Sequence, residues 1–380
     1  MDKVYKYELF NQMIAEFALK EVKPLAQETD EEERFPLETV KKMAKIGLFG
    51  IIVPTEYGGM GGDYAMYIRA VEEISKYCAT TGVILSAHTS LCVAPILEYG
   101  TEEQKKKYLP KLASGEWLGA FGLTEPNAGT DANNQTTTAV KRGDSYVLNG
   151  SKIFITNAGY ASLYFITAVT GKNEKGLECA NFLVESGFDG FSVGKKEKKM
   201  GIRGSSTCEL IFDDCVVPQE NIVGKIGDGV KVALKTLDGG RIGIAAQALG
   251  IAEGALQTTL DYVLERKQFG RPIAQFQNTQ FVLAEIATNI EAARLLVEKA
   301  RDAKQVKAPN TAVLAAQAKL FASKTAVDVT DKCVQLHGGY GYTRDYAVER
   351  MMRDAKITEI YEGTSEVQKM VISGALLKRR

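Results

Sequence analysis

The sequence predicts an α+β fold in which a helical block, a β block and a second helical block follow one another. Apolar residues recur at helical spacing up to about residue 115, and short apolar runs separated by Gly, Asn and Lys follow. Long helical periodicity returns from about residue 227. These two periods distinguish helices from strands. We therefore expect an N-terminal helical domain at 1–115, a small β-barrel or sandwich domain at 116–226 and a C-terminal helical bundle at 227–380.

Three helices are expected in the first block. Leu37, Val40 and Met43 recur at helical spacing within residues 36–47, where Gly47 marks the end. The loop EYGGMGGD at 56–63 is too rich in glycine to be regular. A second helix is predicted over 64–76, and a third begins at Thr101, where TEEQ has the pattern of a capping box.

The second block has the pattern of strands. Tyr146 and Leu148 lie on one side of Asn149-Gly150 and residues 153–155 lie on the other. This arrangement predicts a hairpin that turns at Asn-Gly. Further strands are predicted at 163–169, 180–184 and 209–212 because these apolar runs have strand length.

The third block predicts long helices. Leu283, Ile286, Ile290, Ala293 and Val297 fall on one helical face. Two more helical patterns cover residues 311–334 and 348 to about 360. Long helices joined by short glycine-containing turns are typical of a bundle, and stripes of this kind are usually only core.

Composition and charge exclude several functions. The 47 basic and 47 acidic residues among 380 cancel, so no overall field attracts nucleic acid or a membrane surface. No apolar run is expected to approach the roughly 20 residues that cross a bilayer, and the first residues do not resemble a signal peptide. Two histidines argue against a metal centre, and six scattered cysteines fit reduced thiols in the cytoplasm.

Four segments have a composition that suits ligand binding. FGLTEPNAGTD at 121–131 offers backbone amides and hydroxyls that can donate to a heterocycle or a phosphate. ERKQFGR at 265–271 carries guanidinium groups suited to a pyrophosphate, and QLHGGYG at 335–341 allows close backbone approach. FITN at 154–157 is nearly uninformative alone. Each segment also fits an ordinary loop or helix end.

Taken together, these segments resemble the acyl-CoA dehydrogenase family. The motifs are TEPNAGTD, NGSKIFITN, ERKQFG, QLHGGYGYTRDY and RDAKITEIYEGTSEVQ, and they occur in order along essentially the whole chain. The nearest resemblance is to the short-chain, butyryl-CoA type of anaerobic bacteria. It implies the same helical, β and helical order, ending in a four-helix bundle. It also implies FAD as cofactor, an acyl-CoA substrate, an electron-transferring flavoprotein as partner and a homotetramer.

The resemblance assigns the catalytic base to Glu362, in the motif IYEGT. A thioester α-carbon is a weak acid, so the carboxylate that deprotonates it must be held close and shielded from water. In the family, the β-hydrogen leaves as hydride to the flavin. Glu359 is the local alternative because i and i+3 share a helix face. Some relatives place the base before the Arg of L-D-x-x-R, where this chain has Gly240, which cannot accept a proton.

The same resemblance assigns further residues to FAD and to the substrate. Part of the flavin site comes from a neighbouring subunit in the family. The residues implied for FAD are Phe121, Leu123, Thr124, Gly129, Thr130, Phe154, Ile155, Thr156, Arg266, Gln268, Phe269, Gln277, Gln335, Leu336, Gly338, Gly339, Thr364, Ser365 and Glu366. The residues implied for the substrate are Thr130, Asp238, Arg241, Gln247, Thr358 and Gly363.

Gln247 and Thr358 match the short-chain pattern. A Gln that protrudes into the acyl slot would shorten it, although Gln247 could instead cap a buried carbonyl. The resemblance leaves open two other functions: reduction of an enoyl-CoA, such as crotonyl-CoA or an arylacrylyl-CoA, and a non-catalytic CoA-binding subunit. An oxidase that passes electrons to oxygen is less favoured because such relatives are usually longer.

Overall fold

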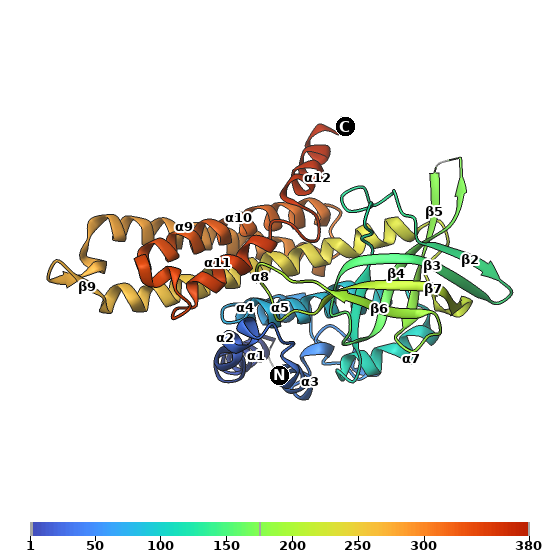
Figure 1. The fold of residues 1–380 in the computed structure, drawn as a ribbon, viewed down its shortest axis with the longest axis horizontal. Helices are drawn as coiled ribbons and strands as arrows, with labels where there is room; N and C mark the ends of the chain where they lie inside the picture. Colours follow the sequence, from blue (N-terminus) through green and yellow to red (C-terminus); the bar gives the residue numbers. More distant parts are fainter. Residues whose placement is uncertain (1–2, 175, 379–380) are drawn as a thin grey trace.

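The computed structural model describes residues 3–174 and 176–378. Figure 1 shows three parts, with the N-terminal helices beside a β domain and a long helical bundle extending away from both. Helix α8 runs from the bundle to the sheet and so connects the two. This is the predicted α+β architecture.

The N-terminal part is built of helices and contains no strand among its described residues. Its α-helices are α1 (Lys3–Phe17), α2 (Ala26–Glu31), α3 (Leu37–Lys45), α4 (Tyr64–Ser75), α5 (Ala79–Ser86), α6 (Ala94–Tyr99) and α7 (Glu102–Ala113). The π-helical segment η5 (Ala87–Val93) joins α5 to α6. Thr101 and Gln104 form the predicted capping box at the start of α7. The three helices expected in this block are confirmed as α3, α4 and α7.

One helical stretch corrects the expectation about apolar runs. Residues Ala79–Tyr99 form 21 consecutive helical residues with a mean hydropathy of 1.4, which is long and apolar enough to cross a bilayer. The reason is that small and polar residues such as Thr80, Thr89 and Ser90 interrupt the apolar letters without breaking the helix. This stretch is 94% buried inside the protein, as expected for a core helix.

The β domain is built on one mostly antiparallel sheet. Its strands are β1 (Leu118–Gly122), β2 (Thr138–Arg142), β3 (Ser145–Thr156), β4 (Ala161–Asn173), β5 (Gly176–Glu185), β6 (Phe191–Lys196), β7 (Thr207–Pro218) and β8 (Ile222–Val223). Their order is β6-β7-β3-β2-β4-β5-β8, and β1 pairs with β4 in parallel. The strands predicted at 163–169, 180–184 and 209–212 are confirmed within β4, β5 and β7.

The predicted turn at Asn149-Gly150 is wrong. Strand β3 runs straight through this dipeptide, and the β2–β3 hairpin turns at Gly143 instead. Gly150 has φ 137° and lies where the register with β7 shifts, so it forms a bulge. The Asn149 side chain is paired with Asp214 across the sheet, which holds it within the strand.

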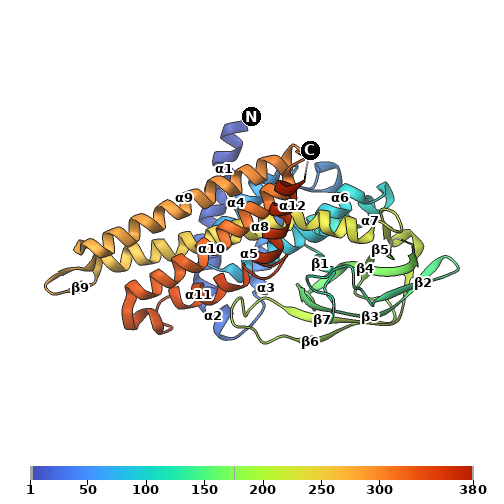
Figure 2. The same cartoon turned by 90° about the horizontal axis from the view of Figure 1, so that it is seen from above.

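The C-terminal part is a bundle of long helices. Its members are α8 (Gly229–Glu265), α9 (Gln277–Gln305), α10 (Thr311–His337) and α11 (Val348–Ile357), with the short hairpin β9 (Lys267–Gln268) and β10 (Arg271–Pro272) between α8 and α9. Ile286, Ile290, Ala293 and Val297 are buried, and Leu283 is partly buried, as their spacing predicts. Figure 2 shows α8, α9, α10 and α11 lying side by side.

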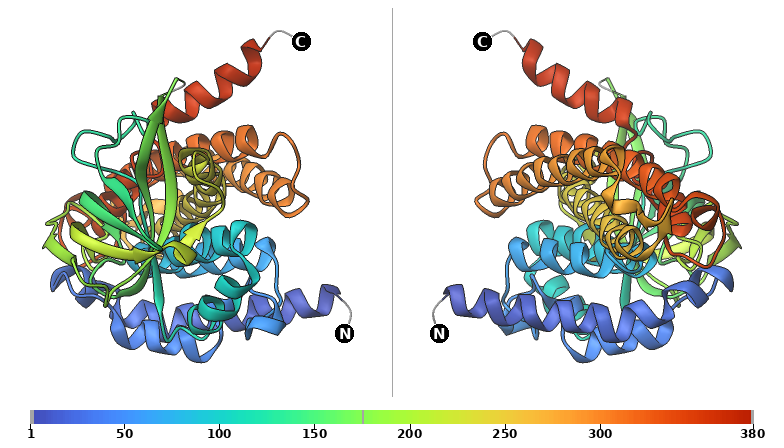
Figure 3. Two further views of the ribbon diagram at one scale, coloured as in Figure 1. Left: turned by 90° about the vertical axis from the view of Figure 1, so that its right-hand side faces the viewer. Right: turned by 90° about the vertical axis from the view of Figure 1, so that its left-hand side faces the viewer.

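The last helix, α12 (Ser365–Leu377), does not join the bundle. Figure 3 shows it projecting from the body of the molecule at the C-terminal end. Met370, Leu376 and Leu377 on this helix are exposed. The short segment between α11 and α12 therefore connects the packed bundle to a projecting helix, and it carries Glu362.

Candidate active site

A cavity of about 640 Å³ lies where the sheet, α8 and the segment between α11 and α12 meet. The chain folds three distant segments onto it, at 121–130, 154–156 and 362–364. The predicted site residues in its lining are Phe121, Leu123, Thr124, Gly129, Thr130, Phe154, Ile155, Thr156, Arg241, Glu362, Gly363 and Thr364. The structure thus brings the predicted base together with one group of predicted flavin residues.

Glu362 carries a carboxylate oxygen, Oε2, that is buried and has no hydrogen-bond partner. Burial raises the pKa of Glu362 to about 8, and the positive charges of Lys319 and Arg241 oppose this rise. A carboxylate of this kind is a stronger proton acceptor than one in water. Glu359, the local alternative, accepts a hydrogen bond from Lys356 and lies outside this cavity.

Three of the eight non-glycine residues with positive φ in the described part of the chain are predicted site residues. Phe154, Phe269 and Glu362 have φ of 59°, 50° and 55°, a left-handed region that favours glycine. Each such residue costs about 1–3 kcal/mol and persists only where its surroundings enforce it. The side chain of Phe154 is 61% exposed and lines the cavity. Two of these three residues, Phe154 and Glu362, thus line the same cavity.

Arg241 contributes the cationic part of the cavity lining. Its Nη1 donates to Asp238 Oδ1 at 3.1 Å, and both side chains are buried on α8. Asp238 does not line the cavity, so its role is to hold the Arg241 side chain in place. The Nε of Arg241 has no hydrogen-bond partner. This donor is available to a polar ligand group.

A buried ion pair lies behind the segment at 121–130. Lys152 Nζ donates to Glu125 Oε1 at 2.7 Å, to Gln135 Oε1 at 2.7 Å and to the Leu123 carbonyl at 3.2 Å. Both charged side chains are almost wholly buried. The pair fixes the backbone from which Leu123 and Thr124 reach the cavity. Sequence reasoning missed it, although a lysine within the apolar run SKIFIT was a usable signal.

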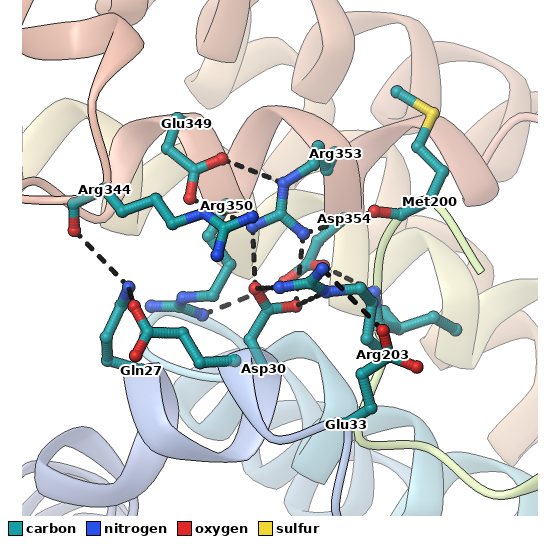
Figure 4. A network of polar contacts seen from close by, with 12 residues as sticks. Gln27, Asp30, Glu33, Met200, Arg203, Arg344, Glu349, Arg350, Arg353 and Asp354 are labelled. Carbon is teal, nitrogen blue, oxygen red and sulfur yellow. Dashed lines mark hydrogen bonds and ion pairs between the residues drawn. The ribbon is translucent and has the colours of Figure 1, made fainter. Parts of the chain in front are cut away.

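A second ionic network fixes the opposite wall, formed by residues 197–202. Figure 4 shows Arg353 of α11 and Arg203 converging on Asp30 of α2. The Asp354 side chain accepts a hydrogen bond from the Ile202 N–H at 2.5 Å. Because Asp30, Arg203 and Arg353 come from the three parts of the fold, this network joins them beside the cavity. Nothing in the sequence pointed to Asp30.

The remaining predicted flavin residues lie far from this cavity. Figure 1 shows β9 at the end of the bundle opposite the β domain. The residues at or near this end are Arg266, Gln268, Phe269, Gln277, Gln335, Leu336, Gly338 and Gly339, and none lines the cavity. Phe269 is 93% exposed, and the Arg266 guanidinium lies 5.3 Å from the Tyr340 ring centre. One chain therefore presents the predicted flavin residues in two separate groups.

Gln247 and Thr358 are buried behind the cavity instead of lining it. Gln247 Nε2 donates to the Ala79 carbonyl at 2.8 Å, and its Oε1 accepts from the Tyr361 hydroxyl. The Thr358 hydroxyl donates to the Ala355 carbonyl at 2.6 Å. Gln247 thus caps a buried carbonyl, and it reaches the cavity only through Tyr361, which lines it.

Ser365 and Glu366 line a second hollow, of about 830 Å³, between α9, α10 and α12. Thr364 lines both hollows and caps α12 by accepting from the Val367 N–H. Within residues 3–174 and 176–378, no group of three His, Cys, Asp or Glu side chains is placed to hold a metal ion.

Comparison with known proteins decides the family. Models of the N-terminal, middle and C-terminal domains of acyl-CoA dehydrogenases match residues 6–116, 120–215 and 227–377. The chain belongs to the acyl-CoA dehydrogenase family. It is 62% identical to the short-chain specific acyl-CoA dehydrogenase of Clostridium acetobutylicum over 98% of both chains. It is 51% identical to the acryloyl-CoA reductase (NADH) of Anaerotignum propionicum, over 98% of this chain and 94% of that one.

Solved structures of this family have the same fold. Butyryl-CoA dehydrogenase from Megasphaera elsdenii superposes with a TM-score of 0.96 at 50% identity, covering 100% of this acyl-CoA dehydrogenase and 99% of that chain. A chain in the structure of the electron transferring flavoprotein of Acidaminococcus fermentans superposes with a TM-score of 0.95 at 53% identity, covering 98% of each.

The cofactor of this acyl-CoA dehydrogenase is FAD, and the cavity fits its ring system. The walls combine apolar side chains with the hydroxyl-bearing residues Thr124, Thr130 and Thr156. A Cβ built on Gly129 would meet nothing within 4 Å, so the space in front of this backbone is open. Glu362 lines the same cavity, so the proposed base and these flavin residues share one space. Within one chain, the cavity can hold only the part of FAD that residues 121–130 and 154–156 reach.

Proposed function

We propose that this chain removes the α and β hydrogens of a short-chain acyl-CoA, of the butyryl-CoA type, to give a trans-2-enoyl-CoA. The observation that carries the proposal is the buried, unpaired carboxylate of Glu362 at the cavity that Thr124, Thr130 and Phe154 also line. Identity of 62% to a short-chain specific relative supports the substrate class.

Glu362 takes the α-proton of the thioester in this proposal. Its burial keeps water from competing for the proton and raises its basicity. In this proposal the backbone N–H of Glu362 donates to the thioester oxygen, which gains negative charge as the proton leaves. Bound FAD supplies the acceptor for the β-hydrogen, which leaves as hydride.

Other residues orient the substrate and the cofactor. Arg241, held by Asp238, is the cavity-lining cation that we assign to the acyl-CoA, and Gly363 would let the thioester approach the backbone. The hydroxyls of Thr124, Thr130 and Thr156 and the ring of Phe154 hold the flavin. Ser365, Glu366 and the distant group at 266–277 and 335–339 serve FAD bound mainly by another subunit.

This division of the flavin residues supports a homotetramer. The exposed Phe269 and the apolar residues of the projecting α12 are surfaces that assembly would cover. An electron-transferring flavoprotein is the proposed partner, supported by the match to a chain in such a flavoprotein's structure. We place the protein in the cytoplasm because its cysteines are free and buried, as in reducing compartments.

A second candidate function is reduction of an enoyl-CoA by the same site. The 51% identity to an acryloyl-CoA reductase favours it. The direction of the reaction depends on the potentials of substrate and partner, and the same base would then donate the α-proton. A non-catalytic CoA-binding role has no such support, because Glu362 and the flavin segments are intact.

An anaerobic titration tests the proposed function. Purified protein is mixed with butyryl-, hexanoyl-, octanoyl-, crotonyl- and cinnamoyl-CoA, and the absorbance of the oxidised flavin is followed. We expect butyryl-CoA to reduce the flavin most efficiently. A colourless protein, or a flavin that no saturated acyl-CoA reduces, would contradict the proposal. Reoxidation of the reduced protein by crotonyl- or cinnamoyl-CoA alone would favour the reductase.

A further inference from the structure

The base lies on a short turn with an uncommon backbone. Glu362 has φ 55° and the next residue, Gly363, has φ 94°, so two consecutive residues are left-handed. This conformation is costly for a residue with a side chain, so other groups must hold it. The carbonyl of Gly363 is the point where they act.

Two buried side chains donate to this carbonyl. Lys319 Nζ lies 2.7 Å from the Gly363 oxygen, and Gln368 Nε2 lies 2.8 Å from it. Lys319 and Gln368 are wholly buried. One turn further along α10, Ser323 donates to the Thr358 carbonyl at 2.7 Å. Helix α10 thus donates hydrogen bonds to carbonyls at both ends of the segment that carries Glu362.

Lys319 is also a buried amine without a close anion, and burial lowers its pKa to about 8 against the opposing charge of Glu362. Within the described part of the chain, no carboxylate lies within 4.0 Å of its ammonium group. Burying such a charge is expensive unless it serves another group. The carboxylates whose charge acts on it are those of Glu362, Glu359 and Glu366. Glu362 is the one at the cavity.

We infer that Lys319 is a positioning residue, which holds the turn that carries Glu362 through the Gly363 carbonyl and stabilises the charged form of Glu362 by its own charge. This inference rests on the proposed function, since it concerns the base of that reaction. Lys319 does not line the cavity, so it acts through Gly363 and through its charge. It explains why a lysine occupies the core of α10.

The charged groups that act on Glu362 come from two helices, and two neutral tyrosines lie near it. Lys319 acts on it from α10 and Arg241 acts on it from α8. The charge of Glu362 contributes to raising the pKa of Tyr67 on α4 and of the neighbouring Tyr361. Lys319 and Arg241 lower the pKa of Glu362, against the effect of burial. Removing Lys319 leaves Arg241 as the only cation that lowers it among the described residues.

Substitutions of Lys319 separate its hydrogen bond from its charge. Lys319→Met removes both, Lys319→Gln keeps an amide donor without charge, and Gln368→Met removes the second donor without changing the charge. Lys332→Met is the matched control. Lys332 is a partly exposed lysine on the same helix, and its side chain pairs with Asp328 and Glu285. Each FAD-loaded variant is measured for flavin reduction by butyryl-CoA from pH 6 to 10, for KM, and for hydrogen exchange of peptides that cover residues 356–366.

We expect Lys319→Met to reduce the limiting rate of flavin reduction about 10- to 100-fold with little change in KM. The apparent pKa of the pH–rate profile should increase by about one unit, because loss of a neighbouring cation raises a carboxyl pKa. Lys319→Gln should show the same pH shift with a smaller rate loss, and it serves if Lys319→Met does not fold. Gln368→Met should speed hydrogen exchange without moving the pH profile. Lys332→Met should match the wild type.

The inference is overturned if Lys319→Met or Lys319→Gln binds FAD and gives wild-type rate, pH profile and hydrogen exchange. It is also overturned if both lysine variants lose rate and speed up exchange without moving the pH profile. A wild-type protein whose flavin butyryl-CoA does not reduce would instead count against the proposed function, so the two failures are distinct.

Discussion

The carboxylate of Glu362 lies directly against Gly240 of α8. A Cβ built on Gly240 would lie 2.8 Å from the carboxylate carbon of Glu362 and 2.8 Å from Leu91 Cδ2, both closer than real Cβ contacts. In this chain, therefore, the position where some relatives carry their base is the space that Glu362 occupies. The two locations for the base exclude each other.

Gly240→Ala is expected to displace the base without unfolding the protein. The atoms that a new Cβ would meet are the ends of two flexible side chains, which can move at low cost, and Ala favours a helix over Gly by about 1 kcal/mol. We predict a thermal midpoint near that of the wild type and a loss of flavin reduction of about 100-fold. Gly374→Ala on α12, where a Cβ meets nothing within 4 Å, is the control. Wild-type activity in Gly240→Ala would show that Glu362 is not confined by α8.

The pH dependence of flavin reduction is expected to follow Glu362. A base acts when it is deprotonated, and burial raises the pKa of Glu362 to about 8 in the ligand-free protein. The second-order rate constant with limiting butyryl-CoA should therefore rise about tenfold per pH unit well below 8 and level off above it. Stopped-flow traces from pH 6 to 10 measure this. A rate that is constant below pH 8 would show that Glu362 is already ionised there.

Gln247 is expected to limit chain length through Tyr361. Its side chain occupies the space behind Tyr361 and accepts a hydrogen bond from that hydroxyl. Gln247→Ala should let Tyr361 move back and raise the ratio of kcat/KM for octanoyl-CoA over butyryl-CoA about tenfold. Gln257→Ala, on the exposed face of the same helix, should leave the ratio unchanged. If the ratio also stays constant in Gln247→Ala, the pocket ends elsewhere.

Asp30 is expected to stabilise the protein at neutral pH. Burial acts to raise its pKa, but the hydrogen bonds and charges of Arg353 and Arg203 outweigh burial and lower it. A lowered carboxyl pKa adds stability that is present above the unfolded value of 3.8 and is lost as pH falls through the folded value.

Asp30→Asn should therefore cost about 3 kcal/mol at pH 7, because two partly buried arginines lose their anion. The difference from wild type should shrink on acidification below pH 3.8. Denaturation midpoints across this range, with the exposed Asp345→Asn as control, measure the effect. Equal midpoints for the wild type and Asp30→Asn at pH 7 would show that the network does not stabilise the protein.

The sequence predicted elements whose signals are local. The capping box at Thr101 and the stripe from Ile286 to Val297 are set by nearest neighbours along one helix. The Asn149-Gly150 turn failed because a partner on a distant strand, Asp214, overrode the local preference. Strands β1, β2 and β6 were missed because they are short, and β1 pairs with β4, which is not its neighbour in sequence. The domain limits at 115/116 and 226/227 stay predictions.

The sequence motifs predicted the residues that line the candidate site, but not the buried residues that hold them in place. Glu362, Thr124 and Phe154 stand in recognisable segments, and the structure brings them to one cavity. Lys319, Lys152 and Asp30 act by contacts with residues up to hundreds of positions away, which no periodicity records. Gln247 was assigned to the acyl slot, but the depth at which it lies depends on how α8 packs against Ala79.

The most direct test of this account is the rate at which butyryl-CoA reduces the flavin of Glu362→Gln under anaerobic conditions. The substitution keeps the size of the side chain and removes the proton acceptor. We predict that the variant binds FAD and butyryl-CoA and that its flavin is reduced about 10²- to 10⁴-fold more slowly than that of the wild type. Reduction at the wild-type rate would contradict the assignment of Glu362 as the base.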